Sequence, residues 1–278
     1  MPLVRNIYGK GRVRVMRVMR DTKRHELREL TVKAMLEGAF AAAFTLADNS
    51  RVVSTDTIKN VVNVVAHENI GATTEPLCQA AARRFLDHYA QVDRVIVTAH
   101  ETKWVRLSVG GTQHPHGFVL DGNGKPFAEV TATRECLSTR SGIDGFTFLK
   151  STGSGWENYF IDEYTTLAPT DDRICATSMN AAWAWSAQPK DYAAANKTLL
   201  EAMLDVFAGT HSNSVQDSLY RMGEAALSAV PEISEISLAC PNKHYIPINL
   251  KPFGIENQNQ VFLPTDEPHG QIECTVAR

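Results

Sequence analysis

Apolar residues recur along this chain in two patterns. In some stretches every second residue is apolar, which is typical of strands with one buried face; in others the spacing is three or four residues, which is typical of amphipathic helices. Alternating stretches predict strands near 5–20, 26–46, 95–99, 105–109, 118–121, 127–137, 143–150, 173–185, 233–250 and 270–277. Helical spacing predicts helices near 54–65, 75–89, 190–207 and 214–226.

The alternation near the start of the chain predicts two further features. Apolar positions change parity at Val15–Met16, which predicts a β-bulge there. The run at 26–46 has an apolar residue at nearly every second position, so we expect one face of a single long strand to be buried. Asp48–Ser50 is a turn-forming stretch that is expected to end this strand.

Three polar stretches between alternating runs are expected to be turns: Glu101–Lys103, Ser138–Gly142 and Pro241–Lys243. In the last of them Asn242 and His244 are two residues apart, so they point to the same face of an extended chain. Together they offer an amide that donates and accepts and an imidazole that exchanges protons near neutral pH. The alternative is that this stretch only forms a turn and carries polar surface side chains.

The order of the predicted elements is strands, two helices and strands, and it occurs twice. We therefore predict two homologous antiparallel α+β domains, 1–137 and 138–278, with helices covering one face of each sheet. Strand edges that stay unpaired within one chain would expose backbone hydrogen-bonding groups. Assembly of several chains into a barrel would pair them.

Composition narrows the class of protein. Hydrophobic residues make up 44% and charged residues 21%, which is ordinary for a globular protein. The net charge of −3 gives no basic field for nucleic acid, and no apolar run approaches membrane-spanning length, so neither partner is expected. The five cysteines are an odd number without a CxxC pair and predict reduced thiols. A cytoplasmic protein is expected, since Val276–Arg278 is not a peroxisomal tripeptide.

His114 and His116 are the only sequence feature that suggests a metal site. They lie two residues apart in a stretch that leads into a predicted strand, and no third ligand clusters with them in the sequence. A zinc site ordinarily needs three or four protein ligands. We therefore expect no metal.

Seven segments, in chain order, resemble the urate oxidase (uricase) family over nearly the whole chain. They are Tyr8–Lys10, Ala47–Ser50, Ser54–Asn60, His114–His116, Asp162–Leu167, Asn213–Gln216 and Pro241–Tyr245. The resemblance implies two tunnelling-fold domains per subunit and a homotetramer that encloses a β-barrel, with active sites between subunits. It also implies oxidation of urate by O2 and water to 5-hydroxyisourate and hydrogen peroxide, without a cofactor.

The same resemblance implies roles for individual residues. Lys10, Thr55 and His244 match the family's proton relay, the chain of groups that passes protons during the reaction. Arg173 and Gln216 match the pair that holds urate by its edge. The full set of implied substrate-binding residues is Thr55, Asp56, Trp156, Arg173, Val215, Gln216 and Asn242, with Asn242 over the oxygen or water site and Trp156 where the family usually has a stacking phenylalanine.

These residue types suit the chemistry, although each has a simpler explanation. An arginine fork pairs two acceptors of a flat anion, but Arg173 could instead form a salt bridge with Asp171 or Asp172. Gln216 could be only a polar residue of a first helical turn, and Lys10 only an exposed charge. Thr55 and Asp56 could cap a helix, and Trp156 could fill a core.

Two other functions remain open from the sequence. The first is a hydrolase or aldolase of the same fold family that handles pterins or purines, some of which need a zinc ion that the sequence does not predict. The second is a non-enzymatic purine-binding protein. The joint presence of Lys10, Thr55 and His244 counts against this second function.

Overall fold

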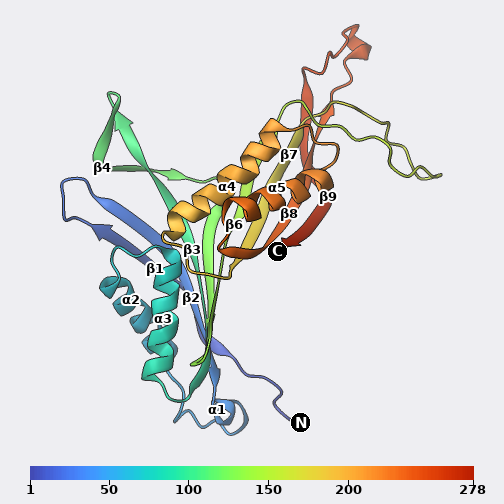
Figure 1. The fold of residues 1–278 in the computed structure, drawn as a ribbon. Coiled ribbons are helices and arrows are strands. Elements are labelled where there is room, and N and C mark those ends of the chain that lie inside the picture. The colour runs from blue at the N-terminus through green and yellow to red at the C-terminus, as the bar shows by residue number, and fades with distance from the viewer. The chain divides into compact units, whose positions relative to one another are not determined.

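The computed structural model describes residues 1–278, and the chain forms two compact units, Met1–Gly142 and Ile143–Arg278 (Figure 1). Each unit has antiparallel strands, two long helices packed against them and its own hydrophobic core. The predicted α+β class with antiparallel strands is confirmed. That 1–137 and 138–278 are homologous domains stays a prediction.

In the first unit the strands pair in the order β1-β2-β3-β5, and β4 pairs with the distal end of β3. Alternate residues of β2 are fully buried beneath the helices, as the spacing of its apolar residues requires. The elements are β1 (Tyr8–Met19), β2 (Glu26–Gly38), α1 (Ala41–Thr45), α2 (Thr55–Glu68), α3 (Thr74–His88), β3 (Val92–Val109), β4 (Thr112–Asp121) and β5 (Lys125–Ala132).

In the second unit the strands pair in the order β6-β7-β8-β9, and β6 begins before the boundary between the units. Trp183 of β7 is 1% exposed, and its indole N–H donates to Asn196 at 3.0 Å, which satisfies the one polar atom of this core residue. The elements are β6 (Leu137–Lys150), β7 (Cys175–Trp185), α4 (Tyr192–Gly209), α5 (Val215–Ala229), β8 (Ile233–Pro247), the short η1 (Lys251–Phe253) and β9 (Phe262–Ala277).

The four predicted helices are confirmed as α2 to α5, and three of them start at side-chain caps. Ser54 accepts from Thr57 N–H at 3.1 Å, and Ser214 accepts from Asp217 N–H at 3.0 Å. Asp191 accepts from the backbone N–H groups at the start of α4. Each cap satisfies donors that the first turn leaves without a helical partner. No helix combines the length and the apolar character that crossing a membrane requires.

The long strand predicted over 26–46 is wrong beyond Gly38. A Cβ at Gly38 would lie 2.1 Å from the carbonyl oxygen of Gln91, so the chain approaches its neighbour too closely there for any side chain. Phe40 is then buried edge-on against Tyr8, with ring centroids 4.8 Å apart. The alanine-rich residues that follow have high helix propensity and form α1 instead of a strand.

The β-bulge lies earlier in β1 than the parity of its apolar residues predicts. Val15 and Met16 pair regularly with β2, and the register shifts between Lys10 and Val13 instead. Arg12 has a φ of 57°, a conformation that few residues other than glycine adopt. The bulge therefore follows Lys10 directly.

The predicted turns at Glu101–Lys103, Ser138–Gly142 and Pro241–Lys243 are wrong, because all three stretches lie within the continuous strands β3, β6 and β8. The end of β3 is a turn at Gly110–Gly111, where both residues have positive φ. Polar residues continue β3 because they find partners: Lys103, for example, pairs with Asp121 at 2.8 Å. The polar interruption of the alternating run in β3 therefore does not mark a turn.

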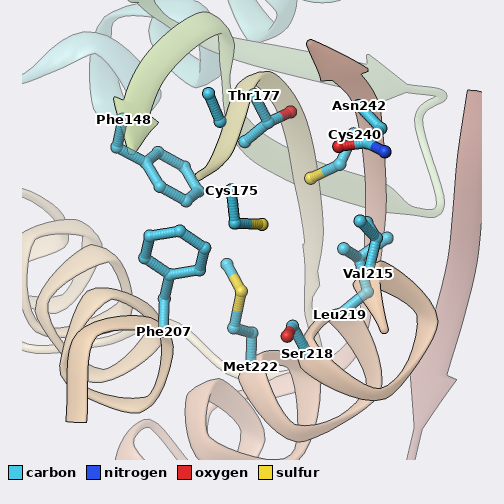
Figure 2. Close-up of a pocket in the computed structure, with 11 residues that line it drawn as sticks. Phe148, Cys175, Thr177, Phe207, Val215, Ser218, Leu219, Met222, Cys240 and Asn242 are labelled. Atoms are coloured by element: carbon cyan, nitrogen blue, oxygen red, sulfur yellow. The ribbon is translucent and has the colours of Figure 1, made fainter. Parts of the chain in front are cut away.

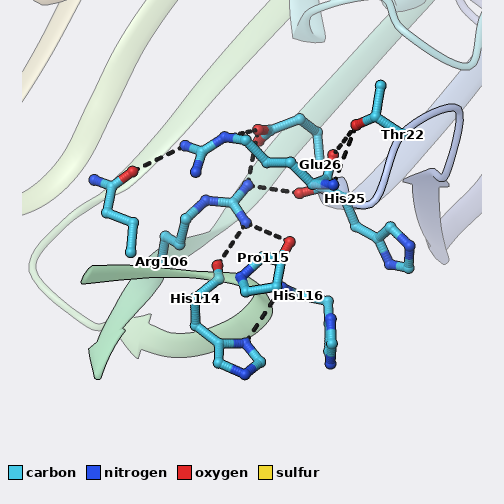
Figure 3. Close-up of polar contacts among 9 residues, drawn as sticks. Thr22, His25, Glu26, Arg106, His114, Pro115 and His116 are labelled. Atoms are coloured by element: carbon cyan, nitrogen blue, oxygen red, sulfur yellow. Dashed lines mark hydrogen bonds and ion pairs between the residues drawn. The ribbon is translucent and has the colours of Figure 1, made fainter. Parts of the chain in front are cut away.

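The segment with His114 and His116 is held by a buried arginine of β3 (Figure 3). One terminal nitrogen of Arg106 donates to the carbonyls of His114 and Pro115 at 3.0 and 2.7 Å. The other donates to the His25 carbonyl at 2.6 Å and to the Glu26 carboxylate at 2.7 Å. Arg106 therefore connects the β1–β2 loop to the β3–β4 hairpin.

Replacing Arg106 with methionine is expected to lower the free energy of unfolding by about 2 kcal/mol, because it removes a charged group with several hydrogen bonds from a nearly buried position. The measurement is the urea concentration at which half of the protein is unfolded, compared between variants that have the same m-value. Arg24→Met is the matched control, since the Arg24 side chain is 52% exposed and loses only exposed contacts, a long ion pair with Glu26 at 3.5 Å and a hydrogen bond to Gln113 at 3.0 Å. Equal midpoints for Arg106→Met and wild type would contradict this role.

Candidate functional site

A pocket with a volume of about 330 Å³ lies within the second unit. Its walls come from the loop before β7, the start of α5 and the paired strands β8 and β9. Six residues singled out from the sequence line it together: Trp156, Arg173, Val215, Gln216, Asn242 and His244. The other lining residues were not predicted from the sequence as part of a site: Leu167, Gly270, Gln271 and Ile272.

The first turn of α5 forms one wall. Ser214 caps the helix, and Val215 is turned inward and only 7% exposed. Gln216 is the next residue and is exposed, so its amide is available at the pocket. The unpaired N–H groups and dipole of a helix start favour an anion nearby.

Strands β8 and β9 form the opposite wall. Asn242 and His244 are two apart on β8 and both line the pocket, as expected for side chains on one face of a strand. Asn242 pairs with Gly270 across the strands, and the register then shifts before His244 pairs with Thr265. The strand pairing therefore explains why Gly270–Ile272 line the pocket, and their residue types alone gave no such signal.

The loop that carries Trp156 has its backbone fixed on both sides. Trp156 N–H donates to the Thr170 carbonyl at 2.7 Å, and Thr170 N–H donates back at 3.0 Å. Ser212 accepts from Gly155 N–H and donates to the Gly153 carbonyl, both at 2.9 Å. These pairs hold the Trp156 backbone at the pocket.

Arg173 supplies the positive charge of the pocket. Its guanidinium carbon lies 5.7 Å from the centre of the Trp156 ring, and burial lowers the pKa of the guanidinium, which stays charged at neutral pH because arginine is so strongly basic. The alternative of a salt bridge to Asp171 or Asp172 is wrong, because Arg173 forms no ion pair. The Asp172 carboxylate accepts from Gly153 N–H at 2.9 Å and from Thr152 Oγ1 at 2.8 Å instead.

Lys10, Thr55 and Asp56 lie in the first unit. Lys10 is on β1, and Thr55 is the first residue of α2, after its Ser54 cap. Tyr8 of β1 is bonded to the segment just before α2, since its hydroxyl accepts from Val53 N–H at 2.8 Å. Asp56 pairs with Lys59, which together with the more weakly acting Lys10 holds the pKa of its carboxyl below the usual value. The Lys10–Thr55–His244 relay stays a prediction.

A second, apolar cavity adjoins the pocket, since Val215 and Asn242 line both (Figure 2). Its volume is only about 10 Å³, far too small for a ring system. Cys175 and Cys240 face it, and burial raises the pKa of both thiols, that of Cys240 to about 12. Both thiols therefore stay protonated at neutral pH and are unsuited to act as nucleophiles.

Comparisons with known proteins agree on one family. A family model described as Uricase matches residues 6–131 and 139–273. The chain is 38% identical to the uricase of Arthrobacter globiformis over 99% of this chain and 90% of that protein, and 36% identical to the uricase of Cyberlindnera jadinii over 98% and 95%. The crystal structure of the Arthrobacter globiformis uricase superposes with a TM-score of 0.95, covering all of this chain and 95% of that one.

Proposed function

The chain belongs to the uricase family of oxidoreductases, and we propose that it oxidises urate with O2 and water to 5-hydroxyisourate and hydrogen peroxide, as a step of purine breakdown. One observation carries the choice of substrate. The pocket holds a half-buried arginine without an ion pair beside an aromatic ring. This combination suits a flat anion.

Urate at neutral pH is such an anion, with hydrogen-bond donors and acceptors around its rim. The fork of Arg173 can donate to two of its acceptors at once. The amide of Gln216 can accept from a ring N–H and donate to a carbonyl. Trp156 offers its face for stacking, and the first turn of α5 adds N–H groups that favour negative charge.

The reaction transfers two electrons from urate to O2, and water supplies the hydroxyl group that adds to the purine ring. Hydrogen peroxide leaves with two protons, so protons must move from urate and water to the reduced oxygen. A Lys10–Thr55–His244 chain can carry them, because a threonine hydroxyl both donates and accepts. The Asn242 amide can donate to oxygen as negative charge develops on it.

We infer that the working molecule is a cytoplasmic homotetramer with its active sites between subunits. Lys10, Thr55 and Asp56 of one subunit would then serve the pocket of another. Apolar side chains on β3 and β4 support assembly, because Val105, Val109 and Leu120 are 49%, 61% and 57% exposed. Clustered exposed apolar residues are typical of a subunit interface.

The test of this function uses chelator-treated protein mixed with urate in air-saturated buffer. The ultraviolet band of urate and dissolved oxygen are followed together, and peroxide is measured at the end. Coupled loss of urate and oxygen with matching peroxide is expected. Intact urate would refute the proposal, and tight binding of urate without turnover would favour a purine-binding protein.

A further inference from the structure

Tyr159 covers one face of the Trp156 indole. The two rings are nearly parallel, with 10° between their planes and 5.6 Å between their centres. Trp156 lines the pocket, and Tyr159 does not. The tyrosine ring therefore packs on Trp156 from outside the pocket and leaves indole surface facing the space where a ligand would bind.

Tyr159 also holds a second wall residue. Its hydroxyl donates a hydrogen bond to the carbonyl of Leu167, which itself lines the pocket. Beyond this bond, Asp162 and Thr165 close a tight turn through a hydroxyl–carboxylate hydrogen bond of 3.0 Å. The segment between Trp156 and Thr170 is thus joined at its base, middle and tip, and Tyr159 makes the middle connection.

We propose that Tyr159 is a positioning residue: it fixes the plane of the Trp156 ring and the place of Leu167, and so raises the affinity of the pocket for a flat purine anion. The proposal rests on the proposed function, since it concerns the same site. Backbone hydrogen bonds fix the Trp156 main chain but leave rotation about its side-chain bonds free. A ring stacked against the indole removes that freedom before the ligand arrives, so less is lost on binding.

The size of the indole makes this support depend on Trp156. A phenylalanine at position 156 would present a smaller surface to Tyr159. The contribution of Tyr159 should therefore shrink when Trp156 is replaced by phenylalanine. A double-mutant cycle measures this coupling directly.

The experiment measures urate affinity without oxygen, by calorimetry, and kcat and KM in air. Tyr159→Leu is expected to weaken anaerobic urate binding by about three- to tenfold, with kcat changed less than KM. Tyr159→Phe keeps the ring and loses only the bond to Leu167, so its loss should be smaller. Phe160→Leu is the matched control, because Phe160 follows in the same loop, is 86% exposed and does not line the pocket.

The outcomes separate this proposal from the function on which it rests. If wild type neither binds nor consumes urate, the proposed function fails and the role of Tyr159 falls with it. If wild type does both while Tyr159→Leu and Tyr159→Phe match it, only the positioning role is overturned. Tighter binding by Tyr159→Leu would also overturn it, by showing that the tyrosine ring competes with the ligand for Trp156. An equal effect of Tyr159→Leu in the Trp156→Phe background would show that Tyr159 does not act through the indole.

Discussion

Replacing Lys10 with methionine is expected to lower kcat for urate oxidation by about 10²- to 10⁴-fold, the usual contribution of a group that transfers protons in the rate-limiting steps. Methionine has nearly the same length and cannot carry a proton, so shape is largely kept while the chemistry is lost. Lys10 lies just before the bulge of β1 and close enough to Asp56, in the first turn of α2, to lower the pKa of its carboxyl in addition to the larger effect of Lys59. Thr55 precedes Asp56 in the sequence and would receive or supply the proton.

The control for Lys10→Met is the same change at Lys33, an exposed residue of the neighbouring strand β2. Lys33→Met should keep wild-type turnover. Thr55→Ala should fall in the same direction as Lys10→Met, and Thr55→Ser should recover much of the loss because it restores the hydroxyl. Near-native kcat in both Lys10→Met and Thr55→Ala would exclude the relay.

Replacing Arg173 with alanine is expected to raise KM for urate by about 10²-fold with a smaller change in kcat, because two charge-assisted hydrogen bonds are lost from the bound anion. This effect is expected because the Arg173 guanidinium is already available to the substrate. It is half-buried at the pocket, lies over Trp156 and has no carboxylate partner that urate would have to displace. Steady-state kinetics and anaerobic binding of urate both measure the effect.

Arg173→Lys separates charge from geometry in this site. Lysine keeps the positive charge but lacks the planar fork, so its KM should lie between those of wild type and Arg173→Ala. An unchanged KM in Arg173→Ala would show that this residue does not hold the substrate. A large fall in kcat with constant KM would assign it to the transition state instead.

Local sequence patterns sufficed for the four long helices of this fold but not for the short α1 or for the turns. Ser214 and Asp217 predicted the start of α5 because a helix cap depends on residues three positions apart. The continuity of β3 through Glu101–Lys103 depends on partners such as Asp121, which is distant in sequence. The end of β2 at Gly38 depends in the same way on the approach of Gln91.

The residues of the pocket also differ in whether they could be predicted from the sequence or depend on strand pairing. Arg173, Gln216 and His244 were predicted from the family resemblance, and their side chains suit the chemistry; the structure brings them to one pocket. Gly270 and Ile272 have no such chemistry and reach the pocket only through pairing with β8. The sequence neighbours Asp171 and Asp172 suggested a salt bridge for Arg173, but the Asp172 carboxylate binds Thr152 and Gly153 instead.

The proposed catalytic site requires residues of both units, contributed by different subunits. Co-assembly of two variants tests this requirement most directly, with activity measured at urate concentrations far below the KM of Arg173→Ala, where each variant alone is nearly inactive. Lys10→Met and Arg173→Ala chains would be unfolded together, refolded at equal amounts and checked for mixed oligomers by mass. Random assembly should restore activity to about one quarter of that of refolded wild type. A site is complete only when its Lys10 comes from an Arg173→Ala chain and its Arg173 comes from a Lys10→Met chain, and each of these has a chance of about one half. Mixed oligomers that stay as inactive as their parents, beside fully active refolded wild type, would contradict a site shared between subunits.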